Sequence, residues 1–212
     1  MTEHHVVKTG TTTVAIMCKD GVVLAGDRRA TAGYVVYKKA KKVVLINENM
    51  AVTTAGNVSD VQLMVKLTKA EMMIKDLQTG RKSTVKEVSS LLAGMLYNNI
   101  RRPSMIPGIA AFLLAGKDQS GFHTYSLDPD GSMLPVDDYV ADGSGSVFAL
   151  GVLESGYKEG MSVDDGVKLA VSALNAAIQR DTASGNGIDV LTITAKGMQF
   201  VIEKQIETRI TA

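Results

Sequence analysis

Apolar residues in the first quarter of the chain fall in short runs that are typical of β-strands. A run at 12–18 and another at 22–26 flank a Lys-Asp-Gly turn, and this arrangement predicts a β-hairpin. Two more apolar runs follow at 43–46 and 51–55. The N-terminal part therefore predicts a sheet.

Helical periodicity begins at Val58 and marks the next segments. Apolar residues then recur at intervals of four, three, four and three, at Leu63, Leu67, Ala70, Ile74 and Leu77. Gly80 suits the left-handed position that often ends a helix. Thr84 and Glu87 have the spacing of a capping box and predict a second helix, and Ser162 is the expected N-cap of a later one.

Strands are predicted again at 109–115 and 122–126, and a last pair at 188–194 and 198–202. The predicted order is strands, two helices, strands, one or two helices, and strands. Such blocks favour an α+β fold with antiparallel sheets over alternating βαβ units. No repeat or long linker divides the 212 residues, which is the size of one domain.

Composition and charge narrow the class of protein. The chain has 45% hydrophobic residues, and its 23 Lys and Arg balance 22 Asp and Glu, which gives no basic surface for nucleic acid or an anionic membrane. Its single cysteine, Cys18, excludes an intrachain disulfide and favours a reducing compartment. No apolar run reaches the ~18 residues of a membrane span, and the first ten residues lack the apolar core of a secretory signal. We expect a soluble, cytoplasmic domain.

Common catalytic motifs are missing from the sequence. It contains no phosphate-binding P-loop and no Gly-x-Ser-x-Gly elbow. Only one of the three histidines, His123, lies beyond position 5, which disfavours both a metal site and a Ser-His-Asp triad. We therefore expect neither a metal nor a cofactor.

A glycine followed by three threonines offers a different chemistry. Gly10-Thr11-Thr12-Thr13 reads equally as the start of a strand, because β-branched residues favour strands. If the Gly10–Thr11 bond is cut, however, Thr11 becomes an N-terminal residue with a hydroxyl nucleophile and its own base, an α-amino group with a pKa of about 8. Such a residue needs no histidine.

Seven segments, in order, resemble the β subunits of the proteasome. They are TTTVAI from Thr11, GDRRATAG (26–33), KKV (41–43), TTAGNVSD (53–60), GSGS (143–146), GVLESGY (151–157) and RDTASG (180–185). The resemblance covers the whole chain and is greatest to active, archaeal-type subunits. It implies a four-layer α-β-β-α sandwich of two antiparallel sheets, the fold of N-terminal nucleophile hydrolases. It also implies that residues 1–10 are a propeptide removed by autolysis and that 11–212 form the catalytic domain.

The same resemblance implies roles for individual residues. Thr11 corresponds to the nucleophile, released by cleavage after Gly10. Asp27 corresponds to a buried acid and Lys42 to the lysine that pairs with it, although without the family they would pass for a surface ion pair. The remaining catalytic positions are Ser144, Asp181 and Ser184 around the terminal amine, and Gly56 at the oxyanion.

Substrate-binding positions are implied as well. The S1 pocket corresponds to Ala30, Ala40, Thr54 and Val58, with Gln62 nearby. Since none of these is charged, we expect a preference for apolar P1 residues. Thr31 and Gly56 are expected to pair with the substrate backbone as an added strand.

The expected function is that of a threonine endopeptidase subunit of the 20S core. The resemblance implies stacked heptameric rings shared with α subunits and other β subunits, and a regulatory ATPase that acts through the α rings. The expected substrates are unfolded polypeptides. Two alternatives remain open: an unprocessed, structural β-like ring subunit, and another N-terminal nucleophile amidohydrolase.

Overall fold

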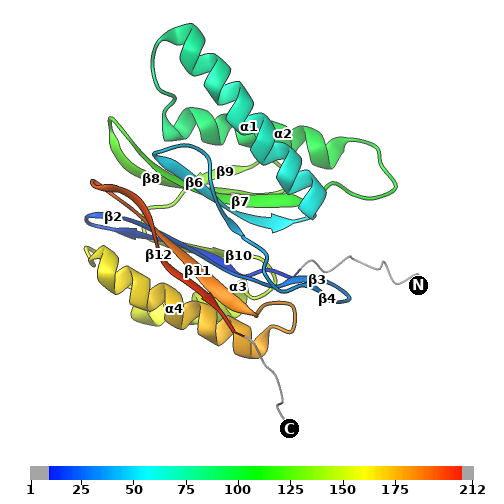
Figure 1. Ribbon diagram of the computed structural model, residues 1–212, viewed down its shortest axis with the longest axis vertical. Helices are drawn as coiled ribbons and strands as arrows, with labels where there is room; N and C mark the ends of the chain where they lie inside the picture. Colours follow the sequence, from blue (N-terminus) through cyan, green and yellow to red (C-terminus); the bar gives the residue numbers. More distant parts are fainter. Residues whose placement is uncertain (1–9, 207–212) are drawn as a thin grey trace.

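The structure, a computed structural model, describes residues 10–206, which fold into four layers (Figure 1). Helices α1 (Val58–Thr79) and α2 (Val85–Arg101) cover the outer face of one sheet. Helices α3 (Ser146–Gly156) and α4 (Val163–Arg180) cover the outer face of the other. The inner faces of the two sheets pack against each other, so the predicted α-β-β-α sandwich is confirmed.

Each of the two main sheets has five antiparallel strands. The first has the order β10 (Tyr139–Asp142), β1 (Thr13–Cys18), β2 (Gly21–Asp27), β11 (Gly187–Thr194) and β12 (Gly197–Gln205). The second has the order β5 (Val43–Leu45), β6 (Met50–Gly56), β7 (Ala110–Asp118), β8 (Gly121–Leu127) and β9 (Met133–Pro135). A separate two-stranded ribbon joins β3 (Ala30–Ala32) and β4 (Tyr34–Tyr37).

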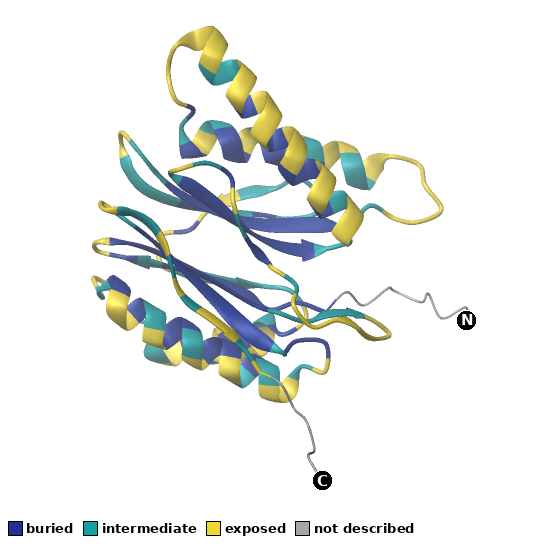
Figure 2. Ribbon diagram, in the orientation of Figure 1, coloured by how far each residue is buried: buried dark blue, intermediate teal, exposed yellow. Residues whose placement is uncertain are grey.

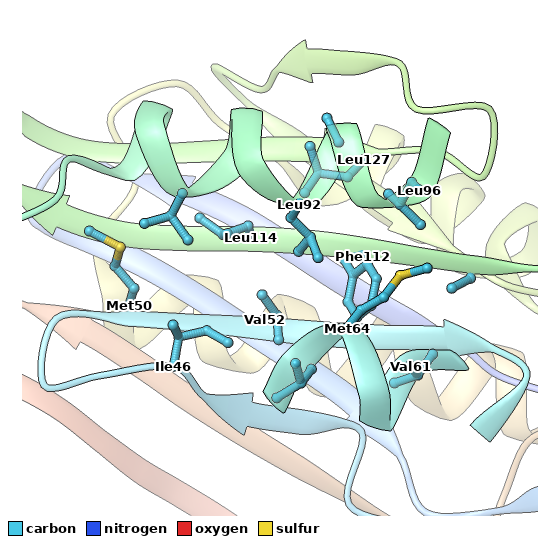
Figure 3. Close-up of a cluster of buried hydrophobic side chains, with 14 of the residues drawn as sticks. Ile46, Met50, Val52, Val61, Met64, Leu92, Leu96, Phe112, Leu114 and Leu127 are labelled. Carbon is cyan, nitrogen blue, oxygen red and sulfur yellow. The ribbon is translucent and has the colours of Figure 1, made fainter. Parts of the chain in front are cut away.

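The strands are apolar on both faces because each sheet is covered twice. In β1, Val14 and Ile16 face α4, while Ala15 between them faces the second sheet. The core between the second sheet and its helices is drawn in Figure 3, where Met64 of α1 and Leu92 of α2 pack over Phe112. Burial on both faces explains why the sequence showed continuous apolar runs instead of alternation.

The predicted helix ends are confirmed. Gly80 follows α1 in the left-handed conformation, with φ of 67°, and its N–H donates to the carbonyl of Asp76. Thr84 and Glu87 make the reciprocal hydrogen bonds of a capping box at α2. Ser162 accepts a hydrogen bond from the backbone of Asp165 at the start of α4. These are local interactions, which explains why the sequence alone could reveal them.

The periodic apolar residues of α1 do not face the core. Leu63, Leu67, Ile74 and Leu77 are exposed, and Figure 2 shows the outer side of this helix largely in the colour of exposed residues. The buried residues are instead Val61, Met64, Val65, Thr68 and Met72. Helix α1 carries apolar residues around most of its circumference, so spacing alone could not identify the covered face. Of the described helices, none combines the length and apolar content needed to cross a lipid bilayer.

The layered packing predicts which leucines stabilise the fold. Leu174 of α4 is fully buried, whereas Leu77 of α1 is 74% exposed. We expect Leu174→Ala to lower the free energy of unfolding by about 3–5 kcal/mol, because it leaves a cavity in a filled core. The control Leu77→Ala should change it by less than about 0.5 kcal/mol. Urea unfolding of the isolated subunit, followed by circular dichroism, measures both values, and equal losses would contradict this assignment of the core.

Candidate active site

Thr11 lies just before β1, buried beside the carbonyl of Gly10. Its hydroxyl donates to the Gly10 oxygen at 2.7 Å, and Lys42 Nζ donates to the same oxygen at 2.9 Å. A side chain at position 10 would overlap the backbone of Ala183, since its Cβ would lie 2.2 Å from that carbonyl oxygen. Glycine is therefore the residue that fits before Thr11. The arrangement places a hydroxyl and an ammonium on one peptide carbonyl.

Asp27 and Lys42 form a buried ion pair. Lys42 Nζ lies 2.6 Å from Asp27 Oδ1, and the two side chains are 7% and 0% exposed. Oδ1 also accepts the backbone N–H of Thr12, and Oδ2 accepts those of Arg29 and Gly185, each at 2.9 Å. The interpretation of this pair as an ordinary surface ion pair is wrong, because its carboxylate has exchanged water for four protein donors.

The environment of Lys42 makes its proton easier to lose. Burial lowers the pKa of Lys42 below its ordinary value of 10.5, and the neighbouring carboxylates of Asp27 and Asp181 only partly oppose this shift. A lysine with a lowered pKa can exchange a proton with a nearby hydroxyl more readily than an exposed lysine can. Lys42 can therefore act on Thr11 as a base or as a hydrogen-bond donor.

Ser144, Asp181 and Ser184 meet on the other side of Thr11. The Thr11 nitrogen donates to Ser144 Oγ at 3.3 Å, and the hydroxyls of Ser144 and Ser184 each donate to Asp181 Oδ2 at 2.6 Å. Burial alone would raise the pKa of Asp181, but these hydrogen bonds, that of the Ala183 N–H and the charge of Lys42 hold it below its ordinary value. Asp181 therefore stays an acceptor, and the structure brings together the three residues that the sequence predicted.

Two glycines approach the site at positions where a side chain has no room. Gly56, at φ of +104°, would place a Cβ 2.2 Å from the carbonyl oxygen of Ile109. Gly143, at φ of +94°, would place one 2.2 Å from the carbonyl oxygen of Thr11. Both positions therefore require glycine for conformation and for space.

A cavity of about 830 Å³ opens beside Thr11. It is lined by every substrate-binding residue that the sequence predicted, namely Ala30, Thr31, Ala40, Thr54, Gly56, Val58 and Gln62. It is also lined by residues that the sequence analysis missed, among them Tyr37, Lys41, Lys66 and Lys69. The two lysines of α1 follow Gln62 by four and seven residues, so helical spacing from Gln62 was the signal that could have found them.

His123 belongs to a separate cluster at the opposite end of β7. Its Nε2 lies 2.8 Å from Ser120 Oγ and 3.4 Å from Asp118 Oδ1. Because serine and aspartate face the same ring nitrogen, the histidine cannot relay a proton between them as in a Ser-His-Asp triad. Within residues 10–206, no three His, Cys, Asp or Glu side chains gather closely enough to hold a metal ion.

Comparison with known proteins gives a consistent result over almost the whole chain. The proteasome subunit family matches residues 7–193. A proteasome subunit beta of Ferroglobus placidus is 42% identical over 205 residues, or 96% of each chain. A proteasome subunit beta 2 of Pyrococcus abyssi is 47% identical over 199 residues, 93% of each chain. A proteasome subunit beta of Methanothermobacter thermautotrophicus is 42% identical over 203 residues, 95% of this chain and 94% of its own.

The buried ion pair predicts an asymmetric response to charge removal. Asp27→Asn removes the negative charge that pairs with Lys42. It also replaces one carboxylate oxygen by an NH2 group, which cannot accept a hydrogen bond from the backbone N–H groups around it. We therefore expect the free energy of unfolding to fall by about 3–5 kcal/mol. Glu203→Gln is the control, because Glu203 is half-exposed and pairs with Lys41 at the surface, where a pair contributes less than about 1 kcal/mol. Urea unfolding at pH 7 compares the two, and similar losses would show that burial of the pair has no energetic consequence.

Proposed function

Because this chain belongs to the proteasome family as a β-type subunit of the 20S core, we propose that it is an active threonine endopeptidase whose nucleophile is Thr11. The observation that carries the proposal is the meeting of the Thr11 hydroxyl and the Lys42 ammonium on the Gly10 carbonyl. Neither group would need this position in a subunit that served only as a ring scaffold.

The first reaction is cleavage of the chain's own Gly10–Thr11 bond. While that bond is intact, the Thr11 nitrogen is an amide and cannot act as a base. The hydroxyl proton therefore passes to Lys42 in its neutral amine form, which the lowered pKa of Lys42 makes accessible, or to a water beside it. Thr11 Oγ bonds to the Gly10 carbonyl carbon, the carbon–nitrogen bond breaks, and the nitrogen gains a proton. Water then hydrolyses the resulting ester. Lys42 donates to the carbonyl oxygen throughout, where negative charge develops.

The second reaction is hydrolysis of substrate peptides by the same hydroxyl. The freed α-amino group of Thr11 lies within reach of Ser144, which Asp181 orients. Thr11 Oγ attacks the substrate carbonyl, its proton passes to the amine or to Lys42, and the leaving peptide amine takes that proton. We assign the stabilisation of the oxyanion to the N–H of Gly56, which lines the cavity beside Thr11, a contribution of about 3–4 kcal/mol for one such donor.

Membership of the family also supports the proposed assembly. We infer heptameric β rings stacked against rings of α subunits, with unfolded polypeptides delivered through the α rings by an ATPase in the cytoplasm. The second alternative from the sequence, another N-terminal nucleophile amidohydrolase, disagrees with the family match over residues 7–193. The unprocessed scaffold remains the outcome against which the proposal is tested.

Removal of the nucleophile tests the proposal. Co-expressed with an α subunit, the wild-type chain should lose residues 1–10 and expose the amine of Thr11, whereas Thr11→Ala should keep them and lose peptidase activity by more than about 10³-fold. Thr79→Ala, at the exposed end of α1, is the matched control and should be processed normally. Intact mass spectrometry reads out the cleavage. A full-length wild-type chain in an assembled particle would instead identify a scaffold.

The cavity predicts the preferred P1 residue. The predicted pocket positions are uncharged, and the charged residues along the cavity are all lysines, so a basic side chain would meet only like charge. We expect kcat/KM for fluorogenic peptides with Leu or Phe at P1 to exceed that for Arg by at least about tenfold. A panel in which Arg peptides are cut fastest would contradict this.

A further inference from the structure

Thr12 follows the proposed nucleophile in the chain, and the chemistry described above gives its side chain no role. Its hydroxyl oxygen lies 2.7 Å from Ser184 Oγ, and both residues are fully buried. Thr12 does not line the cavity beside Thr11, so a substrate bound there does not touch it. Any effect of this residue on catalysis must therefore pass through its neighbours.

The direction of the hydrogen bond between the two hydroxyls follows from the other bond that Ser184 makes. A serine hydroxyl has one proton to donate. Ser184 donates that proton to Asp181 Oδ2 at 2.6 Å, so Thr12 is the donor in the bond with Ser184. Hydrogen bonds arranged in such a chain polarise one another, and each one strengthens the next. Thr12 therefore strengthens the bond between Ser184 and Asp181.

The same carboxylate oxygen leads on to the nucleophile. Asp181 Oδ2 also accepts the hydroxyl of Ser144 at 2.6 Å, and Ser144 Oγ accepts the N–H of Thr11 at 3.3 Å. The position of Ser144 Oγ therefore depends on where Asp181 Oδ2 lies. The charge of Lys42 acts on Asp181, but the hydrogen bonds of its ammonium go to other groups, so the two serines determine the position of Oδ2.

Thr12 also connects this network to the buried ion pair. Its backbone N–H donates to Asp27 Oδ1 at 2.9 Å, the same oxygen that Lys42 Nζ contacts at 2.6 Å. The backbone of Gly145 lies close to the Thr12 hydroxyl, since a Cβ at position 145 would be 2.0 Å from Thr12 Oγ1. Close packing thus keeps this hydroxyl on Ser184. One residue contacts both halves of the site.

We propose that Thr12 is a positioning residue, which holds the Thr11 nitrogen in place through the two serine hydroxyls and the Asp181 carboxylate. After cleavage of the Gly10–Thr11 bond, that nitrogen is the terminal amine that receives the proton of the Thr11 hydroxyl. Loss of the Thr12 hydroxyl leaves the amine present but less well aligned. The catalytic part of this inference rests on the proposed function.

The first experiment compares Thr12→Ser with Thr12→Ala in the assembled particle, using a fluorogenic peptide with Leu at P1. Both variants lose the threonine methyl group, and only Thr12→Ala also loses the hydroxyl, so the comparison isolates the hydrogen bond. We expect kcat, expressed per processed subunit, to be about tenfold lower in Thr12→Ala than in Thr12→Ser. KM should agree within about twofold, because Thr12 does not touch the substrate.

The same two substitutions at Thr13 are the matched control. Thr13 is the next residue along the chain and is equally buried, but its Oγ1 has no hydrogen-bond partner within residues 10–206. We expect Thr13→Ser and Thr13→Ala to differ by less than about twofold in kcat, because no hydrogen bond is lost. Equal kcat values for the two Thr12 variants, or an equally large difference at Thr13, would overturn the proposal.

Hydrogen exchange separates this inference from the proposed function. In the full chain carrying Thr11→Ala, which keeps residues 1–10, the N–H at position 11 still faces Ser144. By NMR of the isolated subunit, we expect this N–H to exchange about tenfold faster with Thr12→Ala than with Thr12→Ser. The N–H of Glu87, bonded to Thr84 at the start of α2, should exchange at one rate in both.

The two readouts distinguish the two failures. If exchange at position 11 is the same in both variants, the positioning role of Thr12 is wrong, whether or not the particle is active. If exchange differs as expected but the wild-type particle cuts no peptide, the network of Thr12 stands and the proposed function fails.

Discussion

The buried carboxylate of Asp27 is the constraint on which the site depends. It ends β2 in the first sheet, and its partner Lys42 comes just before β5 in the second, so the pair links the two sheets. Its other donors belong to the segment that leads into β1 and to the loop that follows α4. A charge removed from water must have all these partners in place, and three segments distant from β2 in sequence are therefore fixed around one side chain.

Close backbone approach then determines the finer geometry around Thr11. Gly10 lies against Ala183, and Gly143 lies against Thr11 itself, at separations that no side chain could share. The ion pair with Asp27 fixes the position of Lys42 Nζ. The close contacts of the two glycines fix the position of the Gly10 carbonyl, which accepts a hydrogen bond from that nitrogen. Electrostatics and steric fit thus act on the same atoms. A small shift in either would separate the Thr11 hydroxyl from the Lys42 ammonium.

Local features were readable from the sequence, and features that depend on distant partners were not. The ends of α1 and the capping box of α2 follow from residues within one helical turn, and both were predicted correctly. The covered face of α1 depends on which sheet lies beneath it. The short strands β9 and β10 show no alternation of apolar and polar residues that would predict them, because they form only by pairing with neighbouring strands. The proposed catalytic set was found by motif resemblance, whereas Lys66 and Lys69 lie outside the recognised motifs.

Energetics also bear on whether the site has a chemical role. A buried ion pair usually adds little net stability compared with apolar side chains of the same volume, because desolvation offsets most of the attraction between the charges. In place of Asp27, an apolar side chain would avoid that desolvation but would leave the N–H groups of Thr12, Arg29 and Gly185 without their acceptor. What apolar residues could not supply is an ammonium 2.9 Å from the Gly10 oxygen, held by a carboxylate that has all its hydrogen bonds. The placement of these charges is therefore better explained by bond cleavage at Thr11 than by stability.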